Sequence, residues 1–135
     1  MKPLLNGHEN IVFKMLCSCM DNNKYILWSQ VSFSAFLKND KTEDWWEYNK
    51  YYVDFLFVEK NDKKPCLVVE YMGSIKHREY GYIYAKDRFR EAICQKAGLS
   101  FVELEKMENV EDKQQLKEYE SYIKEKLKDF GVLRG

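Results

Sequence analysis

The spacing of apolar residues changes between a helical and a strand period several times along the chain, and each change predicts an element. Apolar positions three or four residues apart indicate helices, whereas short apolar runs bounded by charged or turn-forming residues indicate strands. In chain order the pattern predicts a helix from Asn6 to about Met20, a strand over 24–31, a short helical turn over 32–37, a polar loop over 38–50, strands over 53–58 and 66–71, a loop over 72–81, a helix over 82–97, a strand over 99–104 and a helix over 109–130. This order predicts one α/β domain over residues 1–135, with a four-stranded mixed sheet and helices on its faces.

Short signals mark where the helices begin and end. Asn6 and Glu9 have the spacing of a capping box at the start of the first helix. Gly98 and Gly131 follow the last two helical patterns, where glycine commonly ends a helix. The last helix is expected to bury one apolar stripe, formed by Leu116, Tyr119, Ile123, Leu127 and Phe130.

Two acidic residues lie inside the apolar runs of the central pair of strands. Asp54 is near the start of the run Val53–Val58, and Glu70 is near the end of the run Cys66–Tyr71. In an antiparallel hairpin the start of one strand lies beside the end of the next, so the two acids should be neighbours. Burying two carboxylates is costly, and a divalent cation is the usual compensation. The sequence therefore predicts a metal-binding carboxylate pair, with two solvent-facing acids on edge strands as the alternative.

Further charged residues are expected near this pair. Glu9 on the first helix could lean over the sheet, although an acid at this position often serves only as a capping-box partner. Residues 73–96 contain six Lys or Arg against three Asp or Glu. A carboxylate pair beside such cations suits metal-assisted phosphodiester chemistry, in which the metal activates water and the cations hold phosphates. Because acids alternate with the basic residues in the helix predicted over 82–97, a solvated helix face is the alternative for these residues. His77 could equally be an exposed side chain without a role. The candidate phosphate-binding residues are Lys76, His77, Arg78, Arg88 and Arg90.

Composition narrows the class of protein. A net charge of zero, from 22 basic and 22 acidic residues, argues against a dedicated nucleic-acid coat protein but leaves room for a local basic patch. The four cysteines contain no C-x-x-C pair, which is typical of reduced thiols in a cytoplasmic protein, and a zinc site using His8 or His77 is the less favoured alternative. No leader peptide and no apolar run of about 20 residues is evident, so a cytoplasmic protein without a membrane span is expected.

The motifs of the sheet resemble those of the PD-(D/E)XK nuclease superfamily. The runs VDFLFV and LVVEY, a loop with a histidine, and the stretch KDRFREAICQKAGLSFVEL are similar to bacterial domains of unknown function related to the very-short-patch-repair endonucleases. The opening LLNGHE and the pair Gln30-Val31 also fit that pattern, and the resemblance covers about residues 4–105. The final helix, about 109–130, is an addition.

The resemblance implies a role for individual residues. Asp54 and Glu70 match the two metal-binding acids, and Glu9 matches an auxiliary acid of the first helix that some members use. The third motif position, normally Asp or Lys, is Met72 here, and a methionine cannot bind Mg²⁺ usefully. The resemblance therefore implies either that Lys76 or Lys86 supplies the missing cation, or that catalysis has been lost.

Three functional hypotheses follow. The first is an endonuclease that hydrolyses phosphodiester bonds of DNA with Mg²⁺ or Mn²⁺. The second is a catalytically inactive nuclease fold that binds nucleic acid or a protein partner. The third is an adaptor, or a homodimer, that uses an exposed aromatic surface at Tyr119–Tyr122 of the last helix.

Overall fold

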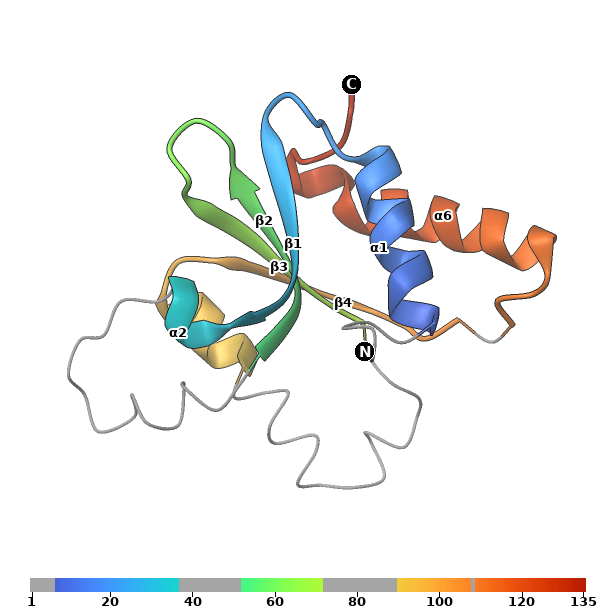
Figure 1. Cartoon of the computed structure of the whole chain (residues 1–135), viewed down its shortest axis with the longest axis horizontal. Helices are drawn as coiled ribbons and strands as arrows, with labels where there is room; N and C mark the ends of the chain where they lie inside the picture. Colours follow the sequence, from blue (N-terminus) through green and yellow to red (C-terminus); the bar gives the residue numbers. More distant parts are fainter. Residues whose placement is uncertain (1–6, 37–51, 72–89, 108) are drawn as a thin grey trace, which may run out of the picture.

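A four-stranded mixed sheet forms the centre of the molecule (Figure 1). The computed structural model describes residues 7–36, 52–71, 90–107 and 109–135. Within these ranges the elements in chain order are α1 (Gly7–Cys19), β1 (Tyr25–Ser32), α2 (Phe33–Phe36), β2 (Tyr52–Glu59), β3 (Pro65–Tyr71), a helical segment at residues 90–96, β4 (Ser100–Leu104), α6 (Lys113–Leu127) and a 3₁₀ turn (Lys128–Phe130). The expected strands and the short helical turn after the first strand are confirmed.

The strands lie side by side in the order β1-β2-β3-β4. The pairs β1–β2 and β2–β3 are antiparallel, whereas β3 and β4 are parallel. This confirms the predicted α/β class with a mixed sheet. It also places both acidic strands, β2 and β3, in the middle of the sheet, so the alternative in which Asp54 and Glu70 lie on edge strands is wrong.

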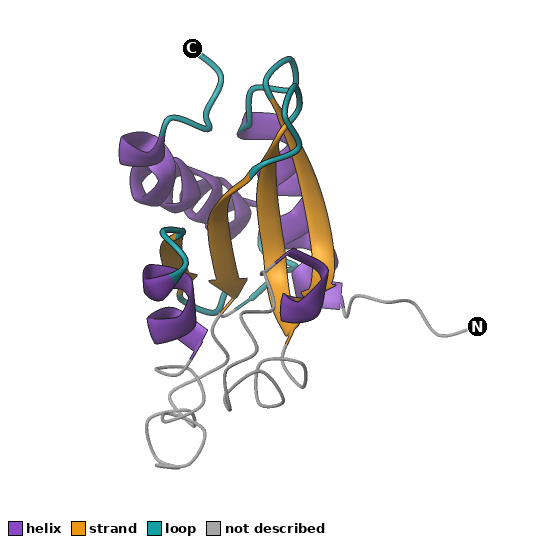
Figure 2. Cartoon of the chain, turned by 90° about the vertical axis from the view of Figure 1, so that its left-hand side faces the viewer, coloured by secondary structure: helices purple, strands orange, loops and turns teal. Residues whose placement is uncertain are grey.

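Helices cover both faces of the sheet (Figure 2). One face carries Phe55 and Val69 and packs against α1 and α6. The other face carries Leu56 and Val68 and packs against α2 and the helical segment 90–96. Because side chains alternate along β2 and β3, these two central strands contribute apolar residues to both cores.

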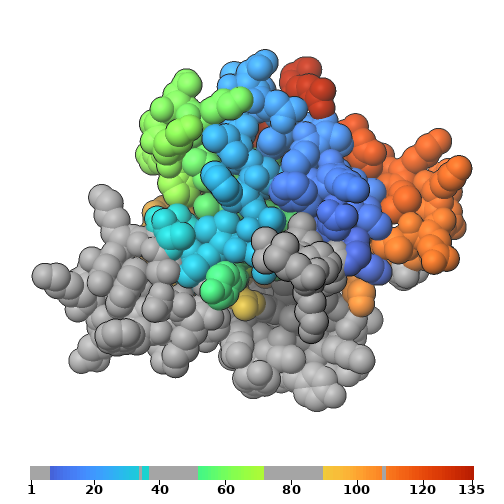
Figure 3. Space-filling view, viewed as in Figure 1, coloured from blue at the N-terminus to red at the C-terminus, as the bar shows by residue number. Residues whose placement is uncertain are grey.

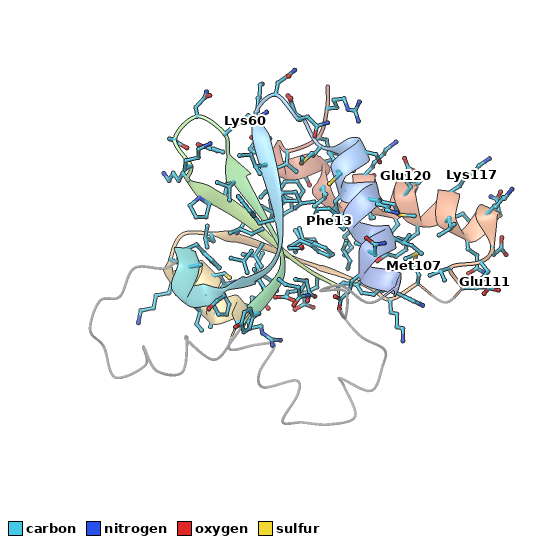
Figure 4. The ribbon with its side chains drawn as sticks, in the orientation of Figure 1. Phe13, Lys60, Met107, Glu111, Lys117 and Glu120 are labelled. Atoms are coloured by element: carbon cyan, nitrogen blue, oxygen red, sulfur yellow. The ribbon has the colours of Figure 1, made fainter. Side chains whose placement is uncertain are left out.

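Helix α1 follows the predicted apolar spacing. Val12, Leu16 and Cys19 are buried, and they lie three or four residues apart on one face. Phe13 points from α1 toward the strands and stacks on Phe55, with ring centroids 6.2 Å apart (Figure 4). The predicted N-cap Asn6 lies outside the described residues.

Helix α6 begins later and ends earlier than the apolar pattern predicted. Asp112 is its N-cap, and the side chain of Asp112 accepts hydrogen bonds from the backbone N–H groups of Gln114 and Gln115. Before it, the side chain of Asn109 accepts from the N–H of Glu111, an Asx turn that competes with helix. The predicted start at Asn109 is therefore wrong.

The predicted end of the last apolar stripe is wrong as well. Tyr119, Ile123 and Leu127 are buried as expected, but Phe130 is the last residue of the 3₁₀ turn and remains 37% exposed. Gly131, at a φ of 75°, then ends the helical stretch in the left-handed conformation that glycine adopts easily. Gly98 plays the same part after the segment 90–96, with a φ of 78°. The predicted loops 38–50 and 72–81 lie outside the described residues, as does the first half of the helix predicted over 82–97. None of the described helices is long and apolar enough to cross a membrane.

Candidate functional site

Asp54 and Glu70 are neighbours on adjacent strands. Phe55 pairs with Val69, which places Asp54 level with Glu70 in the antiparallel register. Glu70 is buried, with 5% of its surface exposed. Burial raises the pKa of Glu70 well above its ordinary value, and the charge of Asp54 together with a hydrogen bond between the two carboxyl groups raises it further, while the positive charge of Arg90 acts in the opposite direction. The predicted proximity of the two acids is confirmed.

The two carboxyl groups differ in how their oxygens are satisfied. Asp54 Oδ2 accepts a hydrogen bond of 2.8 Å from the backbone N–H of Tyr71. Glu70 Oε1 is buried and has no hydrogen-bond partner in the part of the chain that is described. A buried oxygen of this kind is costly unless something pairs with it. Two carboxylates with an unsatisfied oxygen between central strands therefore fit a divalent cation, which binds oxygen ligands of this type.

Glu70 is enclosed from the side of the helical segment 90–96. Burial raises the pKa of the Cys94 thiol to about 12, with the charges of Glu70 and Glu91 adding to the effect. Arg90, at the first described residue of that segment, is close enough to stabilise the Glu70 carboxylate. The helix and the apolar core beneath it thus keep water from one side of Glu70.

Glu103 is a third acid in the same row. It pairs with Glu70 across the parallel β3–β4 ladder and is half-buried. The resemblance to the nuclease motifs does not point to Glu103, although the sequence contains a signal for it. Like the other two acids, Glu103 interrupts an apolar strand, FVEL.

The first turn of α1 lies over the same strands. Glu9 Oε2 accepts a hydrogen bond of 3.1 Å from Gln30 Nε2 on β1. His8 Nδ1 lies 3.1 Å from the hydroxyl of Tyr71 on β3, and that hydroxyl accepts from the backbone N–H of Met107. Figure 4 draws Met107 beside the start of α1. Two consecutive residues of α1 are thus tied to the strands on either side of β2.

The comparisons with known proteins place the chain in a family. Residues 1–127 match the family described as "Protein of unknown function (DUF2726)". The chain belongs to the DUF2726 family. An uncharacterized protein of Haemophilus influenzae is 30% identical over 106 residues, which are 77% of this chain and 54% of that protein. This DUF2726 chain therefore spans about half the length of the curated relative that it matches, and no solved structure matches it.

The DUF2726 structure brings together only part of the predicted site. Asp54 and Arg90 each lie close enough to Glu70 to affect its pKa. Glu9 is held by Gln30 on β1. Among the described residues no three or more His, Cys, Asp or Glu side chains form a group suited to one metal ion, and the role of Glu9 as a metal ligand stays a prediction. The remaining predicted site residues, and Met72, lie outside the described residues: Lys76, His77, Arg78, Lys86 and Arg88.

Two further expectations for this DUF2726 chain are settled by its geometry. Tyr119 is buried and its hydroxyl donates to the carbonyl of Glu105, while the half-buried Tyr122 accepts from the N–H of Glu105. The predicted exposed aromatic surface at Tyr119–Tyr122 is therefore wrong, because both hydroxyl groups anchor α6 to the end of β4. The four cysteines are free thiols, as expected.

Proposed function

We propose that this chain carries a metal-dependent phosphodiesterase site of the PD-(D/E)XK type, acting on DNA. The observation that supports the proposal most directly is the buried, unsatisfied Glu70 oxygen beside Asp54. Two acids side by side in a sheet interior are unfavourable for stability, and a divalent cation between them is the compensation that proteins commonly use. The mixed strand order, with the acids on the two central strands, agrees with the motif resemblance.

In this proposal each residue has a defined part. Asp54 and Glu70 hold Mg²⁺ or Mn²⁺, which when bound lowers the pKa of an attacking water and offsets charge on the phosphate. Glu70 must give up its proton before it can serve as a ligand, and the charge of Arg90 favours that ionised form. Lys76 or Lys86 stabilises the additional negative charge of the reacting phosphate in place of Met72. Lys76, His77, Arg78, Arg88 and Arg90 contact the DNA backbone.

Nicking of supercoiled plasmid in Mg²⁺ or Mn²⁺ tests the proposal. Asp54→Asn and Glu70→Gln keep the size of each side chain and remove the charge that a cation needs, so both should abolish nicking. Glu111→Gln changes an exposed acid just before α6, so it is the matched control and should nick like the wild type. Wild-type nicking that persists in both variants would exclude this site as its source.

A second candidate function is binding without catalysis. Met72 at the third motif position favours it, and so do two exposed aromatic residues on neighbouring strands, Trp28 at 54% and Tyr52 at 55% exposure. In this reading the fold binds nucleic acid, a protein partner or a second copy of itself. DNA binding that falls steeply with salt and is unchanged by chelating the divalent cations, with no nicking, would favour this function over the first.

A further inference from the structure

Gln30 has a backbone conformation that residues other than glycine rarely adopt within a strand. Its φ is 52°, in the left-handed region that favours glycine. Ser29 pairs with Phe55 and Val31 pairs with Val53, which leaves Gln30 level with Asp54. Strain of this kind persists only where the surroundings hold it, and it gathers at functional sites.

At the level of Gln30, the alternation of side chains between the two faces of the sheet is interrupted on both β1 and β2. Residues two apart in a strand normally share a face, yet Val53 and Phe55 belong to different apolar cores. On β1 the same change separates Leu27 from Val31. Figure 1 shows β1 running beside α1 and then bending toward α2. Gln30 and Asp54 therefore occupy the bend itself, where a side chain can reach from β1 to the start of α1.

The contacts of Gln30 connect this bend to the candidate site. Gln30 fixes Glu9 from β1, while Tyr71 on β3 contacts His8 through its hydroxyl and Asp54 through its backbone N–H. Since β2 lies between β1 and β3, the first turn of α1 is held across the strand that carries Asp54. The space-filling view shows α1 (dark blue) at the surface beside β1 (lighter blue) (Figure 3). The carboxylate of Glu9 is thus held by the residue of β1 that lies level with Asp54.

We propose that Gln30 is a positioning residue, and that it fixes the Glu9 carboxylate to accept hydrogen bonds from water around a divalent cation held by Asp54 and Glu70. The inference rests on the proposed function. Among the described residues Glu9 does not form a three-residue ligand group with the two acids, so the proposal places Glu9 one water away from the cation instead of in direct contact with it. Mg²⁺ keeps several of its waters when it binds a protein, so a carboxylate one water away contributes to affinity. The left-handed backbone conformation of Gln30 at the bend places its side-chain amide against Glu9.

The test measures cation affinity instead of catalysis. Mg²⁺ and Mn²⁺ are titrated calorimetrically into the full chain and into Gln30→Gly, Gln30→Ala, Glu9→Gln and the Gln30→Gly/Glu9→Gln double variant. Glycine accepts the φ of position 30, so Gln30→Gly should unfold at a temperature no lower than Gln30→Ala. Both variants should nonetheless bind Mg²⁺ about tenfold more weakly, as is usual when an outer-shell partner of a metal site is lost.

Coupling between the two residues separates positioning from a purely structural role. If Gln30 acts through Glu9, the double variant should bind Mg²⁺ no more weakly than Glu9→Gln alone. The exposed Gln114→Ala, at the start of α6, is the control and should bind as the wild type does. Affinity that is unchanged in Gln30→Gly while Asp54→Asn abolishes binding would overturn this inference and leave the proposed function standing. Wild-type protein that binds neither cation would overturn both.

Discussion

At the scale of single residues, Glu70 is the only charged residue that is buried in the described part of the chain. Its carboxyl group is almost fully buried beside another acid, and both of these conditions favour the protonated form. A residue of this type opposes folding whenever it must be ionised, so a large apolar core has to offset it. The sequence allowed this cost to be foreseen, because an acid within LVVEY has little chance of reaching water on a central strand.

The effect of Glu70 on the stability of the folded state depends on pH in a definite direction. Because the folded state raises the pKa of Glu70 above its unfolded value of 4.5, the folded state binds the proton more tightly. Stability without divalent cations should therefore fall as pH rises from about 4.5 through the pKa of the folded form. Glu70→Gln should remove this slope and raise the Tm at neutral pH by a few degrees, measured by thermal unfolding in EDTA. Glu111→Gln should keep the wild-type slope, and an unchanged slope in Glu70→Gln would show that another group titrates.

The thiols make a second prediction at this scale. Burial raises the pKa of Cys66 to about 11 and that of Cys94 to about 12. The thiolate is the reactive form, so neither residue should react with a thiol reagent within minutes at pH 8 in the native protein, although both should react at once in denaturant. Mass mapping of alkylated peptides measures this, and rapid native labelling of Cys94 would mean that the segment 90–96 opens readily.

At the scale of elements, local signals set most boundaries, and side-chain competition sets the rest. The strands were predictable because apolar runs in β2 and β3 are bounded by charged turn residues. The start of α6 was not, because the Asx turn of Asn109 and the cap at Asp112 compete for the same stretch, and apolar spacing cannot decide between them. Nothing in the sequence indicated the left-handed φ of Gln30, since glutamine has no preference for that conformation.

The N-cap of α6 gives a prediction at this scale. Asp112→Ala removes the acceptor for two backbone N–H groups and should lower the free energy of unfolding by about 1 kcal/mol. Urea unfolding measures the change. Glu111→Ala alters the neighbouring residue, whose side chain does not cap the helix, and should change stability by less than half as much. Equal effects of the two substitutions would contradict the capping role of Asp112.

At the scale of the whole molecule, α6 belongs to the same apolar core as α1 and the sheet. Ile123 and Leu127 are fully buried against that core, and the two tyrosine hydroxyl groups fasten the helix to the end of β4. The sequence alone predicts α6 as an addition to a nuclease-like core. Its amphipathic pattern was clear, but a pattern does not tell which surface an apolar stripe will cover.

Because α6 shares this core, a substitution of a buried residue in α6 should lower the unfolding free energy of the whole structure. Ile123→Ala should cost about 2–5 kcal/mol of unfolding free energy, because it leaves a cavity where α6 meets the sheet. Phe130→Ala, at a partly exposed position just beyond the helix, should cost much less. Urea unfolding followed by both far-UV circular dichroism and fluorescence should give one coincident transition for each variant. Separate transitions would mean that α6 folds as an independent unit.

The last described residues pair with the end of the first helix. Met20 forms a bridge with Leu133, the N–H of Asp21 donates to the carbonyl of Val132, and the N–H of Arg134 donates to the carbonyl of Cys19. During synthesis the first helix emerges from the ribosome long before its partner residues are made. The contacts that join the end of α1 to the C-terminal residues can therefore form only after residue 134 has been translated. A nascent chain stalled before that point would lack these three contacts, so the end of the first helix joins the C-terminal residues only late in synthesis.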